Sequence, residues 1–165
     1  MTEGARRQVR PMSRTTLRVP QVIRLSDAAT NLNWLLERLC DTVPAIRQAV
    51  VVSSDGLALA RSEDVDRDTA DRLAAVSSGM IGLAYGSAGR FGVGPVSNII
   101  VEMERGWLFV TGIRRGSVLC CLTEKEIDLG AIAFEMSIFV QRVGDSLTAD
   151  VRQELKTSLA QPEPA

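Results

Sequence analysis

The order in which helical and strand-like patterns follow one another constrains the fold of this chain most. Between Asn31 and Val143, an amphipathic helix pattern is followed by two short apolar runs, a second helix pattern, three further apolar runs and a last helix pattern. Tight turns that end in glycine join neighbouring runs at 54–56, 104–106 and 114–116. Because glycine accepts the positive φ at the end of a three-residue hairpin loop, this order predicts one hairpin and one three-stranded meander, with a helix between them.

Side-chain periodicity sets the expected bounds of these elements. Apolar residues three and four positions apart predict helices, with Asn31 and Asp66 as the N-caps of the first two. The expected helices cover about 31–42, 66–85 and 128–143, with a further short helix over 150–159. Runs of β-branched and other apolar residues predict strands at 49–52, 57–60, 98–103, 107–113 and 117–123.

Together these elements predict an α+β fold built on one five-stranded antiparallel sheet. With the strands numbered in chain order, joining the first strand to the fifth gives the order 2-1-5-4-3. The helix over 66–85 is expected on one face of the sheet, and the helices over 31–42 and 128–143 on the other.

The two edges of this sheet differ in sequence. The edge strand 57–60 runs directly into a polar segment, whereas 98–103 carries Ile99, Ile100 and Val101 and contains neither proline nor lysine. An apolar edge strand with no such protection invites pairing with another strand. We therefore expect strand 98–103 to be an interaction edge.

The net charge of −1 hides an uneven distribution of charge. Residues 1–25 carry six arginines and one acidic residue, a net charge of +5, whereas the remainder of the chain carries −6. We expect a disordered basic arm at 1–26, one domain at 27–147, and a C-terminal tail at 148–165 that holds at most a short helix. The arm is either a solvated tail or a segment that contacts an acidic surface, which could be nucleic acid, anionic lipid or an acidic partner, and nothing in it indicates specific nucleic-acid binding.

The sequence offers no catalytic constellation. It contains no histidine, which removes the usual nucleophile–base pairs, and its three cysteines lack the CxxC spacing of a zinc site. The glycine-rich stretch 86–95 is not followed by the Gly-Lys-Ser/Thr of a phosphate-binding loop, so it is expected to be a mobile connection, with a partner contact as the alternative. Glu102 and Glu104 are expected at a solvated strand end, and Trp34 and Trp107 either in packing or as interface anchors. We expect no enzyme activity, cofactor or metal.

The helix pattern over 66–85 carries two stripes. The larger residues Thr69, Leu73, Val76, Met80 and Leu83 are expected to lie on the sheet. A second stripe consists of small residues, with Ala75 and Gly79 in one row and Ser78, Gly82 and Gly86 in the next. Each glycine inside a helix costs roughly 1 kcal/mol relative to alanine, so something is expected to pack closely there. That neighbour is either the protein's own sheet, a second copy or a partner.

Three segments resemble the Roadblock (dynein light-chain) family, in the bacterial branch that partners Ras-like GTPases of the Mgl type. Within that branch the chain is similar to the actinobacterial conservon proteins, which are encoded beside a sensor kinase and a small GTPase. The segments are LNWLLERLCDTVPAIRQAVVVSSDGLALA (32–60), DRDTADRLAAVSSGMIGLA (66–84) and VEMERGWLFVTGI (101–113).

This resemblance implies a homodimer and a GTPase-regulating or scaffolding role without a catalytic site. The implied dimer interface is strand pairing through Ser97, Asn98, Ile99, Ile100, Val101, Glu102 and Met103. A docking face for a Ras-like GTPase is expected at Ala74, Ala75, Ser78 and Gly82. A sensor kinase complex is a further candidate partner. The expected location is the cytoplasm, with membrane association only through partners. The alternative function is a small-molecule sensor domain, which would need an apolar cavity of about 300 Å³ or more.

Overall fold

The computed structural model describes residues 27–160, so the predicted basic arm at 1–26 and the last residues, 161–165, lie outside the described part of the chain. The helices are α1 (Asp27–Thr42), α2 (Arg67–Phe91), α3 (Leu129–Gly144) and α4 (Ala149–Ala160). The strands are β1 (Ile46–Val52), β2 (Ala58–Arg61), β3 (Asn98–Met103), β4 (Gly106–Gly112) and β5 (Val118–Thr123), with a 3-10 turn at Arg114–Gly116.

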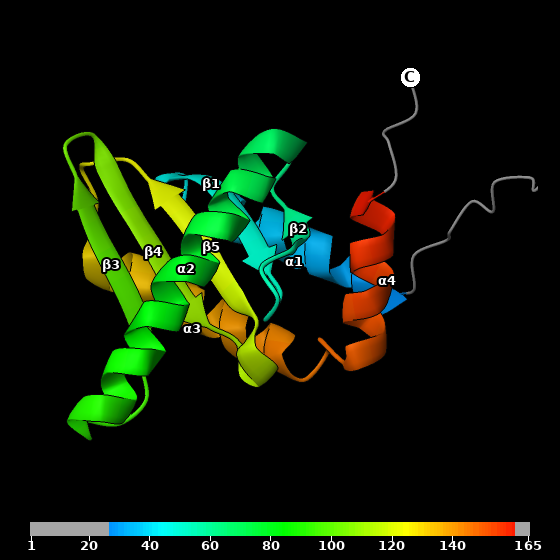
Figure 1. The fold of residues 1–165 in the computed structure, drawn as a ribbon. Coiled ribbons are helices and arrows are strands. Elements are labelled where there is room, and N and C mark those ends of the chain that lie inside the picture. The colour runs from blue at the N-terminus through cyan, green and yellow to red at the C-terminus, as the bar shows by residue number, and fades with distance from the viewer. Residues whose placement is uncertain (1–26, 161–165) are drawn as a thin grey trace, which may run out of the picture.

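The five strands form one antiparallel sheet in the order β2-β1-β5-β4-β3, as the sequence predicted. Figure 1 shows α2 lying across one face of this sheet, with α1 and α3 behind the other face. The predicted assignment of helices to faces is therefore confirmed. None of the helices within 27–160 is both long and apolar enough to cross a membrane.

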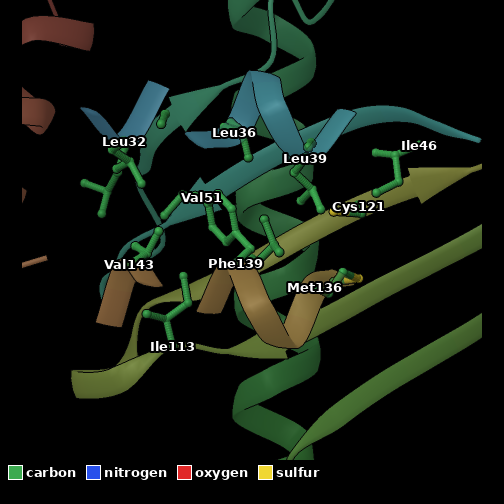
Figure 2. Close-up of a cluster of buried hydrophobic side chains, with 14 of the residues drawn as sticks. Leu32, Leu36, Leu39, Ile46, Val51, Ile113, Cys121, Met136, Phe139 and Val143 are labelled. Atoms are coloured by element: carbon green, nitrogen blue, oxygen red, sulfur yellow. The ribbon is translucent and has the colours of Figure 1, made fainter. Parts of the chain in front are cut away.

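Two hydrophobic cores lie on the two faces of the sheet, and alternation along β1 and β5 divides their residues between them. Val50 and Cys120 belong to the core under α2, whereas Val51 and Cys121 belong to the core under α1 and α3. Figure 2 shows side chains of α1 and α3 meeting over the sheet, Leu36 and Leu39 from one helix and Met136 and Phe139 from the other. Burial on both faces explains why β1 reads as a continuous valine run rather than as an alternating pattern.

Both predicted N-terminal boundaries can be compared with the observed ones. The carboxylate of Asp66 accepts the backbone N–H of Thr69 at 2.7 Å, which confirms Asp66 as the N-cap of α2. The prediction for Asn31 is wrong, because α1 begins at Asp27 and Asn31 lies inside the helix. Asn31 precedes the first large apolar residue of the stripe, and that order was mistaken for the helix start.

The prediction of a loop over 86–95 is also wrong in its first half, because α2 continues to Phe91. The helix ends at Gly92, whose φ of 64° is left-handed and whose N–H donates to the carbonyl of Ala88. Glycine in this conformation is a common helix terminator. Gly86 and Gly89 have helical backbones, so the glycines of this stretch do not all interrupt regular structure.

The expected C-terminal tail contains a helix that packs against the domain. Leu155 of α4 is buried in the core shared with α1 and α3, and Leu159 packs against the core under α2. The ammonium of Lys156 lies 2.7 Å from the carboxylate of Asp55 in the β1–β2 turn, and this hydrogen bond is the main cause of a lowered pKa for Asp55. Helix α4 thus lies beside β2, at the end of the sheet opposite β3 (Figure 1).

Gly106 is required for a different reason from the one that the turn pattern suggested. Gly56 and Gly116 have positive φ values, but Gly106 does not. A Cβ on Gly106 would lie 2.2 Å from the carbonyl oxygen of Thr123 on the neighbouring strand. The glycine therefore permits close backbone approach within the sheet.

We expect Gly106→Ala to lower the free energy of unfolding by about 2 kcal/mol, because the backbone must shift to relieve the contact. Urea denaturation followed by circular dichroism measures this change. Gly89→Ala is the matched control, since a Cβ there meets nothing within 4 Å and helix propensity favours alanine. Equal denaturation midpoints for Gly106→Ala and the wild type would contradict the steric explanation.

Candidate protein-interaction site

Strand β3 is an open edge of the sheet. Among residues 27–160 it pairs with β4 alone, and its register places Ile100 opposite Phe109 and Val101 opposite Leu108. Ile99 and Val101 pack against the core under α2, while Ile100 points to the opposite face and is 48% exposed. The strand therefore presents apolar side chains next to unpaired backbone.

The hydrogen-bond pattern shows which backbone groups face outward. The N–H of Gly112 donates to the carbonyl of Ser97 at 3.4 Å, which makes these opposed residues a hydrogen-bonded pair. Such pairs alternate along an antiparallel ladder, so Ile99 and Val101 bond to β4. The backbone N–H and C=O groups of Asn98, Ile100 and Glu102 therefore point away from β4, toward the free edge.

One end of this edge is fixed by side-chain contacts from the segment after β5. The ammonium of Lys125 lies 2.5 Å from the carboxylate of Glu102 and 3.1 Å from the carbonyl oxygen of Met103. It also lies 4.9 Å from the ring centre of Trp107. The indole N–H of Trp107 donates to the carbonyl of Lys125 at 3.1 Å, so Trp107 packs at the strand end, and Glu102 is paired rather than simply solvated.

The face of α2 that contacts the sheet matches the predicted stripe at Leu73 and Met80 and differs from it elsewhere. Its buried residues are Ala70, Leu73, Ala74, Ser77 and Ile81. Leu83, which was expected on the sheet, is 77% exposed, and Val76 is also exposed. The prediction followed the larger side chains, but small residues fit against the crowded valines of the sheet. Ser77 is accommodated there because its hydroxyl donates to the carbonyl of Leu73 at 2.6 Å.

The four residues predicted as a docking face lie on one side of α2 but differ in exposure. Ala75 and Gly82 are exposed, and Ser78 is half-buried beside the Gly56 turn. Ala74 is only 1% exposed and belongs to the core, so its side chain offers almost no surface to a partner in the folded subunit. The pattern of small residues did not distinguish a core alanine from a surface alanine.

The glycines of α2 face open space. A Cβ added to Gly79, Gly82 or Gly86 would meet nothing within 4 Å. Close approach to the protein's own sheet is thus not the reason for these glycines. They leave the helix backbone accessible beside the exposed apolar side chains of Val76 and Leu83. We call the exposed surface formed by Ala75, Val76, Gly79, Gly82, Leu83 and Gly86 the outer face of α2.

The cysteines of this chain are not activated as nucleophiles. Burial raises the pKa of the Cys120 thiol to about 12, and it also raises the pKa values of Cys121 and Cys40, so these thiols are poor nucleophiles at neutral pH. Within 27–160, no cluster of three potential metal ligands is present. The hollow beside the Gly56 turn, about 310 Å³ and bordered by Leu57, Lys156 and Leu159, is an open groove rather than an enclosed ligand cavity.

Comparisons with known proteins find a matching domain family and similar solved structures. A sequence model of the Roadblock/LC7 domain matches residues 32–123. A solved Roadblock/LC7 domain from Streptomyces avermitilis is 34% identical, with 70% of this chain and 96% of that chain covered and a TM-score of 0.67. MglB from Myxococcus xanthus is 20% identical, with 75% and 97% covered and a TM-score of 0.61. The gliding protein MglB from Thermus thermophilus is 18% identical, with 82% and 98% covered and a TM-score of 0.61.

No sequence among the curated proteins matches the chain significantly. At 18–20% identity, the two MglB structures support the fold alone. The Streptomyces domain is similar in sequence as well as in structure, and the domain model spans more than half of the chain. The chain therefore belongs to the Roadblock/LC7 domain family.

Proposed function

We propose that this protein is a non-enzymatic regulator or scaffold that binds a Ras-like small GTPase as a homodimer in a bacterial signalling system. The observation that carries the proposal is the exposed glycine backbone on the outer face of α2, on a subunit that also has an open edge at β3. A GTPase partner is what the resemblance of the sequence to the Mgl-type branch implies. A cytoplasmic location follows from such a partner, with membrane association only through a sensor kinase complex.

The homodimer forms through antiparallel pairing of β3 with β3 of a second copy. Ser97 to Met103 supply this interface, and the outward N–H and C=O groups of Asn98, Ile100 and Glu102 bond across it. A two-fold arrangement satisfies both edges at once and closes the assembly. The β2 edge is a poorer candidate, because α4 lies beside it.

In this dimer, the two α2 helices lie on the same side of a continuous sheet. Ala75, Ser78 and Gly82 then border a docking surface for the GTPase, and Ala74 supports it from below. Glycine at Gly79 and Gly82 lets a partner approach the helix backbone. Asp68, exposed in the first turn of α2, adds negative charge that steers a basic partner surface.

In this proposal the protein contributes a docking surface rather than a catalytic group. Roadblock docking would hold the switch loops of the GTPase in one arrangement, so that residues of the GTPase itself carry any hydrolysis. Accelerated hydrolysis is not required by this proposal. A regulator or scaffold needs only different affinities for the two nucleotide states of its partner.

Gly82→Arg tests the docking surface. Arginine is expected to weaken GTPase binding at least tenfold, because its side chain fills the space that the partner backbone would occupy. Isothermal titration calorimetry with the Ras-like GTPase encoded nearest to this gene, loaded with a GTP analogue, measures the change.

Two variants control this experiment. Gly82→Ala adds one methyl group and favours the helix by about 1 kcal/mol, so it should raise the melting temperature and reduce affinity less than arginine does. Gln153→Arg adds the same charge on the exposed side of α4 and should bind like the wild type. Unchanged affinity in a folded Gly82→Arg dimer would remove α2 from the proposed mechanism.

A further inference from the structure

A second surface lies on the opposite side of the sheet from α2, along the outer seam between α1 and α3. A hollow of about 280 Å³ opens there; it is lined by Leu35, Arg38, Leu39, Thr42, Glu135, Ile138, Phe139 and Arg142. A wider hollow of about 560 Å³ continues beside the start of α1, where it is lined by Asp27, Thr30, Asn31, Trp34 and Ser146. A narrow hollow that includes Leu35, Asn31 and Ser146 lies between these two. We call these three neighbouring hollows together the seam furrow.

The seam furrow is long enough for a peptide segment. Asn31 and Leu32 line it together with Val143 near the end of α3, whereas Thr42 lines it together with Glu135 in the middle of α3, so the two helices run antiparallel along it. From Asp27 to Thr42 the helix rises about 22 Å at 1.5 Å per residue. Figure 2 shows Leu39 and Phe139 pointing toward each other from the two helices, at the inner side of this seam.

The lining combines apolar side chains with charged ones. Leu35 and Ile138 are half-buried and give apolar surface, while Arg38 and Arg142 supply two positive charges and Glu135 one negative charge. Within the described residues, neither Arg38 nor Arg142 forms an ion pair with a carboxylate. Two arginines against the single carboxylate of Glu135 give this hollow a net positive charge, which is complementary to a segment that carries acidic side chains beside apolar ones.

Exposed aromatic residues border the same surface. Trp34 is 50% exposed, and its ring centre lies 5.1 Å from the guanidinium carbon of Arg38. Phe134, on the outer side of α3, is 61% exposed. Tryptophan and arginine are among the residues most enriched at the energetic centres of protein interfaces. Here they are adjacent, on the side of the molecule that the proposed dimer and GTPase contacts leave free.

We propose that the seam furrow binds an acidic amphipathic segment of a partner protein, with acidic residues against Arg38 and Arg142 and apolar residues over Leu35 and Ile138. Amphipathic segments that place an apolar face in a groove are a recurring mode of peptide recognition. The protein's own N-terminal residues are an unsuitable occupant, because residues 1–25 carry a net charge of +5. This site is separate from the outer face of α2, so both can be occupied in one subunit.

A peptide selection on the full-length protein tests the proposal. A phage-displayed library of random 16-residue peptides is selected on the wild type and counter-selected on the double variant Arg38→Glu/Arg142→Glu. Enriched peptides are expected to combine aspartate or glutamate with apolar residues. Fluorescence anisotropy of labelled peptides should show at least 30-fold weaker binding to the double variant, and weaker binding to the wild type as salt is added.

A matched charge change elsewhere is the control. Arg105→Glu/Arg115→Glu alters two other exposed arginines and should change peptide affinity less than threefold. The absence of enriched peptides, enrichment of basic or purely apolar peptides, or equal binding to both double variants would overturn the proposal. Light scattering adds one more outcome: a change of oligomeric state in Arg38→Glu/Arg142→Glu would assign the furrow to contact between copies instead. None of these results depends on GTPase binding.

Discussion

Replacing Ile100 with proline is expected to convert the proposed dimer into monomers at micromolar concentration. The N–H of Ile100 points away from β4, so proline removes a bond across the interface without removing one from the β3–β4 ladder. In a two-fold dimer the loss occurs twice, at about 1 kcal/mol per hydrogen bond, and the proline ring adds a steric clash. A total of about 3 kcal/mol raises the dissociation constant about 100-fold. Analytical ultracentrifugation over a concentration series measures this dissociation constant.

Two substitutions separate the loss of the outward N–H from the loss of the isoleucine side chain and from a general loss of subunit stability. Ile100→Ala keeps the outward N–H and is expected to dimerise far better than Ile100→Pro. Ile99→Pro removes a donor that faces β4 and is expected to destabilise the subunit itself. A wild type that is monomeric at these concentrations would refute the homodimer, and an Ile100→Pro variant that remains dimeric would move the interface away from β3.

Leu155→Ala is expected to lower the free energy of unfolding by about 3 kcal/mol. Leu155 is among the largest fully buried side chains of the described residues, and truncation leaves a cavity between α4, α1 and the sheet. Loosening α4 should also uncover β2, so larger assemblies than the wild-type form are expected. Chemical denaturation measures the stability, and size-exclusion chromatography with light scattering measures the assembly.

Thr157→Ala, on the same helix but exposed, is the control and should leave both properties close to those of the wild type. If Leu155→Ala unfolds at the wild-type denaturant concentration, α4 is not a part of the cooperative unit. If Leu155→Ala is destabilised but forms no larger species, the proposal that α4 keeps β2 from pairing is wrong, while the contribution of α4 to the core remains.

Much of the fold could be predicted because local patterns agree with the tertiary structure. The valine run of β1, the glycine turns at Gly56 and Gly116, and the N-cap at Asp66 each indicate the element that forms. The extension of α2 was missed because Gly86 and Gly89 were interpreted as loop residues. Glycine weakens a helix without ending it, and only the left-handed Gly92 provides the end.

The candidate site was harder to predict, since it depends on which small residues face the sheet. Periodicity gave the open edge at β3 correctly as a strand, but it could not separate Ala74 from Ala75 on neighbouring faces of α2. The seam furrow was not predicted at all. Arg38 and Arg142 are far apart in sequence, and only the antiparallel contact of α1 and α3 brings them to one groove.

The position of α4 beside β2 determines how many subunits can join. A sheet with two available edges is a bivalent unit and polymerises, whereas a sheet with one is monovalent, and its growth stops after the first addition. If subunits pair through β3 as proposed and α4 keeps β2 unavailable, raising the protein concentration is expected to change the fraction of subunits in pairs and not the size of the complex. The stoichiometry of any signalling complex built on this protein is then a property of its C-terminal helix.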